Sequence, residues 1–140
     1  MKRNLPTLLL ILFLGAFFSS VRAEDEMRLS YCRGVVAAEG GLKVPGKGWT
    51  SLAAYMPQAM LCAYQNNDIR SVRVGLTATT NVEKVTVWVR SRLYSADIVA
   101  DTVDASTLKR GWNVINLSRP YTITGRERGL YIGYYQEMGQ

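Results

Sequence analysis

Most of the chain after Asp68 alternates apolar and polar residues with a period of two. This alternation is typical of β-strands that have one face in a core and the other face outside it. It is clearest in two runs, with Val72, Val74 and Leu76 on one face of the first and Val85, Val87 and Val89 on one face of the second. Weaker runs cover 98–103, 112–117 and 130–135. The pattern therefore limits this part of the chain to an all-β fold.

Residues that tolerate tight or left-handed backbone separate these runs, at 79–81, 109–111 and 124–125. Such breaks predict that neighbouring strands pair antiparallel. Upstream, residues 28–33 and 49–55 predict two further strands, with a glycine-rich loop between them. Pro57 suits the first turn of a short helix that continues through Ala63, ends near residues 66 and 67, and closes one end of the sheets. Seven or so short strands predict an antiparallel β-sandwich of jelly-roll or immunoglobulin-like topology with one short helix.

The first 23 residues have the three-part layout of a secretory signal peptide. Lys2 and Arg3 precede an apolar run over 8–18, and small residues at Val21 and Ala23 mark a cleavage site before Glu24. The apolar run has about a dozen residues, whereas a membrane-spanning helix needs roughly 20. We therefore expect residues 1–23 to be a cleaved leader outside the fold. Residues 24–140 are then a single secreted domain without stable membrane insertion.

Removing this leader lowers the number of Lys and Arg residues from 17 to 14 against 11 acids, so the net charge falls from +6 to +3. The remaining basic residues are scattered, apart from Arg90 with Arg92 and Arg126 with Arg128. A nucleic-acid-binding protein usually concentrates its basic residues on one face. The charge pattern therefore argues against a nucleic-acid partner.

The chain has two cysteines, Cys32 and Cys62, and no histidine. Outside the cytoplasm the two thiols can form a disulfide if their Cα atoms lie within about 7 Å. Alternatively, Cys62 is a small apolar residue within an apolar run. Two cysteines without histidine cannot make a four-ligand zinc site.

The absence of histidine also removes the commonest general base, so no Ser-His-Asp or Cys-His arrangement can form. Asp97, Asp101 and Asp104 lie close in sequence, but this spacing is typical of a solvated edge and lacks the glycine-containing pattern of a calcium loop. We therefore expect no catalytic residue, no metal site and no cofactor, and the chain is predicted not to be an enzyme.

Three aromatic residues, Trp88, Tyr131 and Tyr135, fall on the faces opposite the aliphatic residues of their strands. A half-exposed aromatic row of this kind can bind a sugar, with Arg90, Asn116 or Gln136 supplying polar contacts. Alternatively, the rings pack against a loop, another strand or a neighbouring domain. Trp88, Arg90, Tyr131 and Tyr135 are the predicted ligand-binding residues.

Several short segments together resemble a recurrent β-sandwich module of secreted Bacteroidetes surface proteins. They lie at 31–34, 69–75, 110–117, 120–125 and 129–134, and include I-x-x-V-R-V, G-W-N-x-I and G-L-Y-I-G-Y patterns. The resemblance covers nearly the whole predicted mature chain. It implies a jelly-roll-like fold, often found ahead of adhesive or carbohydrate-associated domains, and it implies no catalytic residue.

Similar modules continue past the last of these segments with further strands. The resemblance therefore implies a chain truncated at its C-terminus, or one whose open strand edge near 130–136 pairs with another chain. The leading functional hypothesis is a non-enzymatic secreted or cell-surface adhesion module that binds a glycan or a cell-surface protein. The alternative is a structural accessory domain of a larger secreted enzyme such as a peptidase.

Overall fold

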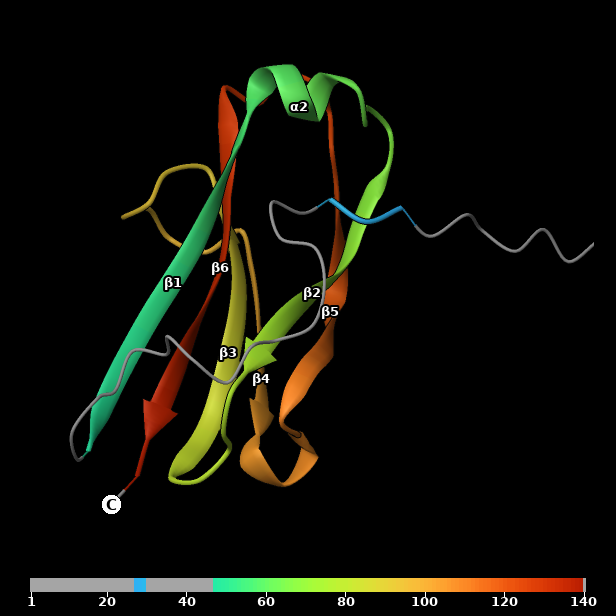
Figure 1. Cartoon of the computed structure of the whole chain (residues 1–140). Helices are drawn as coiled ribbons and strands as arrows, with labels where there is room; N and C mark the ends of the chain where they lie inside the picture. The colour runs from blue at the N-terminus through green and yellow to red at the C-terminus, as the bar shows by residue number, and fades with distance from the viewer. Residues whose placement is uncertain (1–26, 30–46, 140) are drawn as a thin grey trace, which may run out of the picture. The chain divides into compact units, whose positions relative to one another are not determined.

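The computed structural model describes residues 27–29 and 47–139, and residues 47–139 form two antiparallel β-sheets that face each other (Figure 1). The larger sheet has the strand order β1–β6–β3–β4, with bounds β1 Gly48–Pro57, β6 Gly129–Met138, β3 Val82–Arg90 and β4 Val99–Asp104. The smaller sheet pairs β2 (Asp68–Leu76) with β5 (Gly111–Thr122). A 3₁₀ turn, η1 (Ala105–Thr107), joins β4 to the loop before β5. The structure thus confirms the predicted all-β antiparallel sandwich.

The core lies between the sheets and consists of the aliphatic faces that the alternation predicted. Its members are less than a tenth exposed and include Val72, Val74, Leu76, Val85, Val87, Val89, Ile115, Leu117 and Leu130. Fully burying one such side chain stabilises the fold by roughly 1.5–3 kcal/mol. Because these residues occupy alternate positions, the opposite face of each strand remains available for other contacts.

The short helix α2 (Gln58–Cys62) follows Pro57 and lies at one end of the sheets (Figure 1). Its Leu61 is completely buried, which confirms that the helix closes this end. The helical turn continues into a loop in which Asn66 adopts a left-handed φ of 66°, and the backbone N–H of Asn66 donates to the carbonyl of Ile123 over 2.8 Å. The predicted helix end near residues 66 and 67 is therefore wrong, because the helix ends at Cys62 and the following residues form the turn that leads into β2.

The prediction that sequence neighbours pair is correct only for β3 and β4. Each of the connections β2–β3, β4–β5 and β5–β6 crosses from one sheet to the other, so the partners of these strands are distant in sequence. In particular, β6 pairs with β1 on one side and with β3 on the other. The predicted open edge at 130–136 is therefore wrong, because this segment is a central strand.

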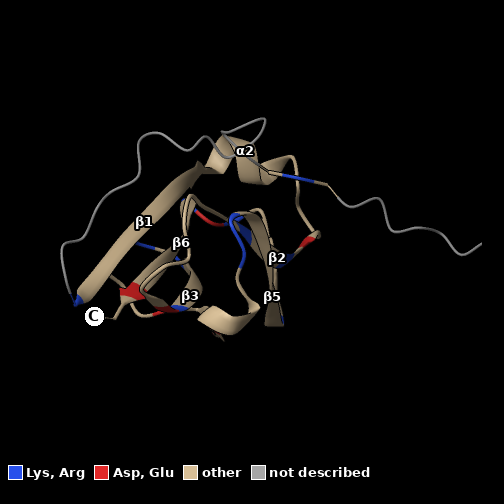
Figure 2. Cartoon of the chain, turned by 60° about the horizontal axis from the view of Figure 1, so that its bottom comes forward, with Lys and Arg blue, Asp and Glu red and all other residues tan. Residues whose placement is uncertain are grey.

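Strand β1 includes the predicted strand 49–55 and lies at one edge of the larger sheet. It has no charged residue between its ends, as Figure 2 shows by its uniform colour. The other upstream strand, predicted at 28–33, is not formed at residues 28 and 29, and residues 30–33 lie outside the described part of the chain.

The predicted leader at 1–23 also lies outside the described residues, so the signal peptide and the domain boundary at residue 24 stay predictions. Within 27–29 and 47–139, none of the helices has the length and apolar character needed to cross a bilayer.

Candidate ligand-binding site

The outer face of the larger sheet, which points away from the core, carries four rows of side chains. The strand registers place the members of each row side by side across β1, β6 and β3, in the order Trp49–Glu137–Lys84, Ser51–Tyr135–Thr86, Ala53–Gly133–Trp88 and Tyr55–Tyr131–Arg90. All four predicted ligand-binding residues are on this face. The sheet therefore brings together aromatic and charged side chains that are up to 88 positions apart in sequence, as in the pairing of Trp49 with Glu137.

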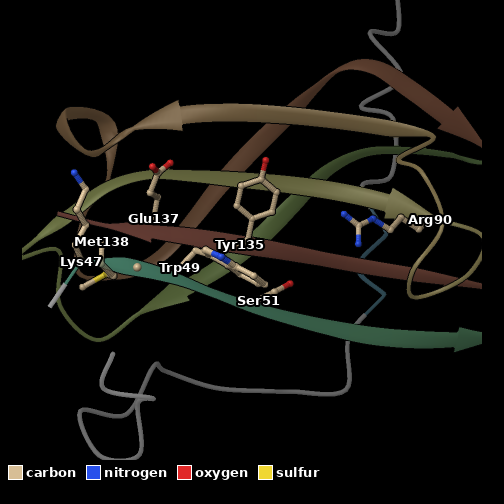
Figure 3. Close-up of a pocket in the computed structure, with 8 residues that line it drawn as sticks. Lys47, Trp49, Ser51, Arg90, Tyr135, Glu137 and Met138 are labelled. Atoms are coloured by element: carbon tan, nitrogen blue, oxygen red, sulfur yellow. The ribbon is translucent and has the colours of Figure 1, made fainter. Parts of the chain in front are cut away.

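A groove of about 570 Å³ lies over part of this face. Its lining comes from the start of β1, the end of β6 and the end of β3, and consists of Lys47, Gly48, Trp49, Ser51, Arg90, Tyr135, Glu137 and Met138 (Figure 3). Two of the four predicted residues, Arg90 and Tyr135, thus meet in one groove. This volume lies within the roughly 300–1,000 Å³ typical of small-molecule sites.

The aromatic part of the groove is Trp49 and Tyr135. The side chain of Trp49 is 72% exposed, which is unusual for the largest apolar side chain, whereas Tyr135 is half-buried. Figure 3 shows the two rings on adjacent strands of the groove, with Ser51 beside them. They offer flat apolar surface beside hydroxyl groups, a combination that suits a ligand with both apolar and polar faces.

Arg90 is held in a fixed position at the other side of the groove. Its guanidinium carbon lies 4.0 Å from the ring centroid of Trp88, its Nε donates to Asp97 over 2.5 Å, and its Nη1 donates to the carbonyl of Leu93 over 3.1 Å. Within the described residues, Nη2 makes no hydrogen bond. A cation stacked on an indole and anchored by a carboxylate keeps its orientation, so one guanidinium edge is oriented in advance for a ligand acceptor.

Trp88 supports Arg90 from below and is not itself part of the groove surface. The prediction of a half-exposed Trp88 ring is wrong, because only 1% of the residue is exposed. Its neighbours across the strands are Gly133 and Ala100, which leave room for the ring against the sheet. A Cβ added to Gly133 would lie 2.6 Å from Cζ2 of Trp88, so the indole occupies the space of the missing side chain.

Tyr131 lies in the last row, outside the groove lining, and packs on Tyr55 of β1. The two ring centroids are 4.8 Å apart and the ring planes are tilted by 40°. The hydroxyl of Tyr55 donates to the carbonyl of Arg128 over 3.3 Å. This pair continues the aromatic surface of the outer face toward the α2 end, beyond Trp88.

The charges around the groove are largely paired. Nζ of Lys84 lies 2.9 Å from Oε2 of Glu137, and this hydrogen bond raises the pKa of the Lys84 ammonium. Asp97 forms an ion pair with Arg90. The groove is thus polar at its rim without a strong excess of either charge, which favours a neutral, hydroxyl-rich ligand over a highly charged one.

Sequence reasoning did not identify Trp49 as a site residue. The segment 49–55 was predicted as a strand, but only the register with β6 shows that Trp49 and Tyr135 share a face. The suggested polar contacts from Asn116 and Gln136 are wrong. Asn116 belongs to β5 in the smaller sheet, and Gln136, the neighbour of Tyr135 along β6, points to the opposite face.

Two of the three aspartates that lie close in sequence, Asp97 and Asp101, make structural contacts. Asp97 binds Arg90, and Oδ2 of Asp101 accepts the backbone N–H of Ser118 over 2.9 Å. In the described ranges, no three acidic, cysteine or histidine side chains gather in a way that could hold a metal ion. Cys62 has an exposed thiol 3.7 Å from the carbonyl of Gly125. Cys32 lies outside the described residues, so the disulfide stays a prediction.

Comparison of the chain with protein-family models, with curated proteins and with solved structures finds no match. The resemblance to a module of secreted Bacteroidetes surface proteins therefore stays a prediction, and the argument for function depends on the groove.

Proposed function

We propose that this protein is a non-enzymatic, secreted or cell-surface adhesion module that binds a glycan in the groove on the outer face of its larger sheet. The observation that carries the proposal is the juxtaposition of an exposed Trp49, a half-buried Tyr135 and an anchored Arg90 around about 570 Å³ of open space. The predicted leader at 1–23 supports a location where extracellular glycans are accessible.

The chemistry of a sugar matches this arrangement. The C–H face of a pyranose is apolar and packs on a flat aromatic ring, while its hydroxyl groups need hydrogen-bond partners around the edge. Trp49 and Tyr135 provide the rings. Arg90, Ser51 and Glu137 provide donors and acceptors, and Arg90 loses little conformational entropy on binding because Asp97 and Trp88 already fix its position.

The proposal is tested by applying the secreted protein to a glycan array and then measuring affinity for the best glycan by calorimetry. Trp49→Ala and Tyr135→Ala should each weaken binding about tenfold or more, equivalent to ~1.4 kcal/mol, because each removes one stacking surface. Arg90→Met should also weaken binding, because it removes the anchored donor and keeps an apolar side chain over Trp88.

Tyr94→Ala is the matched control, because Tyr94 is 95% exposed and does not line the groove. It should bind like the unmodified protein, and the melting temperatures of all the groove variants should confirm that they remain folded. If no glycan binds the folded protein, or if Trp49→Ala and Tyr135→Ala bind as well as the control, the glycan-binding proposal is wrong. The accessory-domain hypothesis would then be the better account.

A further inference from the structure

The polar groups of the groove lie on both sides of its aromatic part, along the direction of the strands. On the outer face of β6, Tyr135 lies between Gly133 and Glu137, which are each two positions away. The guanidinium of Arg90 covers the indole of Trp88, and Trp88 is the cross-strand neighbour of Gly133. Figure 3 shows Glu137, Tyr135 and Arg90 in this order along the sheet. A ligand stacked on Tyr135 therefore has a charged group on either side.

The distance between these two charged groups is longer than one sugar. Glu137 lies four positions after Gly133 on β6, which corresponds to about 14 Å along a strand. Opposite hydroxyl oxygens of one pyranose lie only about 5–6 Å apart, because each bond of the ring and its substituents is ~1.5 Å long. One sugar therefore cannot contact Arg90 and Glu137 together, and a chain of sugar units is needed to contact both.

Each charged group has hydrogen-bonding capacity that a flanking sugar can use. At one end, Asp97 and the carbonyl of Leu93 accept from Nε and Nη1 of Arg90, and within the described part of the chain its Nη2 makes no hydrogen bond. At the other end, Oε2 of Glu137 lies 2.9 Å from Nζ of Lys84. A carboxylate has several lone pairs, so Glu137 can accept a further hydroxyl group. Hydrogen bonds to such charged groups are stronger than those between neutral groups.

We infer that the groove binds an internal stretch of a linear glycan, aligned with the strands and at least three sugar units long. The central unit stacks on Tyr135 and Trp49. The unit on one side accepts from Nη2 of Arg90, and the unit on the other side donates to the carboxylate of Glu137. A terminal sugar stacked on Tyr135 would use only one of these charged groups, so the arrangement favours a sugar that is linked on both sides. This inference rests on the proposed glycan binding and specifies the ligand as a chain.

The test is an array that carries linear polysaccharides and their fragments of one to six units, followed by calorimetry, or by NMR titration for the weakest fragments. Affinity should rise at least about tenfold from the single sugar to the trisaccharide, because the flanking units add hydrogen bonds to charged groups. It should then level off in longer chains. Hexasaccharides that are chemically blocked at both ends should bind as tightly as unblocked ones, because the groove contacts the interior of the chain.

Two variants test the ends of the groove separately. Arg90→Met and Glu137→Gln should each lower the affinity for the hexasaccharide about tenfold and lower the affinity for the single sugar much less. Arg92→Met is the matched control, because Arg92 is exposed in the loop after β3 and does not line the groove. It should bind every length like the unmodified protein.

The outcomes separate this inference from the proposal on which it rests. If the single sugar binds as tightly as the hexasaccharide, or if blocking the chain ends abolishes binding, the inference is wrong and the proposed glycan binding stands. Folded Arg90→Met and Glu137→Gln proteins that bind every length like the Arg92→Met control overturn the inference as well. If no glycan of any length binds, the inference and the proposed function are both wrong.

Discussion

At the residue scale, the outer face depends on the absence of a side chain at Gly133. A Cβ at this position would lie only 2.5 Å from the carbonyl oxygen of Leu52 and would also collide with the indole of Trp88. The indole therefore lies against the sheet, and its upper face holds the guanidinium of Arg90 at 4.0 Å. Trp88 acts on the site through Arg90, so it is a positioning residue, whereas Trp49 and Tyr135 present surface to a ligand.

This difference predicts losses of stability of different size for two aromatic residues of the same face. Trp88→Ala should lower the free energy of unfolding by about 3–5 kcal/mol, because it empties a fully packed position. Tyr135→Ala should lower it by less, because the ring is only half-buried. Urea unfolding of both variants measures the comparison. Equal losses would contradict the assignment of Trp88 to the packed interior and Tyr135 to the groove.

A carboxylate far from the groove predicts a pH dependence of stability. Oε1 of Glu127 accepts the backbone N–H of Thr124 over 2.8 Å, the hydroxyl of Thr124 over 2.8 Å and the hydroxyl of Tyr121 over 2.9 Å. Burial alone would raise the pKa of Glu127, but these hydrogen bonds outweigh burial and lower its pKa to about 2. Burial, followed by the bond to Glu127, raises the pKa of Tyr121 to about 12.

Because the pKa of Glu127 is lower in the folded state than its ordinary value of 4.5, the unfolded chain binds the proton more tightly. The stabilisation by Glu127 is complete above pH 4.5 and is lost as the pH falls toward about 2. Glu127→Gln should lower the free energy of unfolding at neutral pH by roughly 1.5–3 kcal/mol, the range for hydrogen bonds to a charged group. The difference between the two proteins should shrink between those pH values. A constant difference in acid denaturation curves would mean that the carboxylate does not stabilise this turn.

At the scale of strands and turns, the sequence predicted local features well and pairing partners poorly. Alternation identified the buried faces of β2 and β3 because the direction of a side chain in a strand follows from its position alone. Asn81 and Gly111 were predicted as turn residues, and both adopt positive φ angles, 63° and 99°. Such properties depend on a few consecutive residues, so they can be predicted from the sequence without knowledge of the fold.

Strand partners depend instead on contacts between segments far apart in the chain. The register that joins Ser51 to Tyr135 has no local signal, so the sequence could place Tyr135 on an outer face but could not bring Trp49 beside it. The prediction that the Trp88 ring is half-exposed was wrong for a related reason. Alternation places Trp88 on the outer face correctly, yet only the pairing with Gly133 explains why a residue on that face is buried.

At the scale of the whole domain, the larger sheet separates two tasks by its faces. Its inner face packs on the smaller sheet and stabilises the fold, so the outer face is free to vary in shape and chemistry without loss of the core.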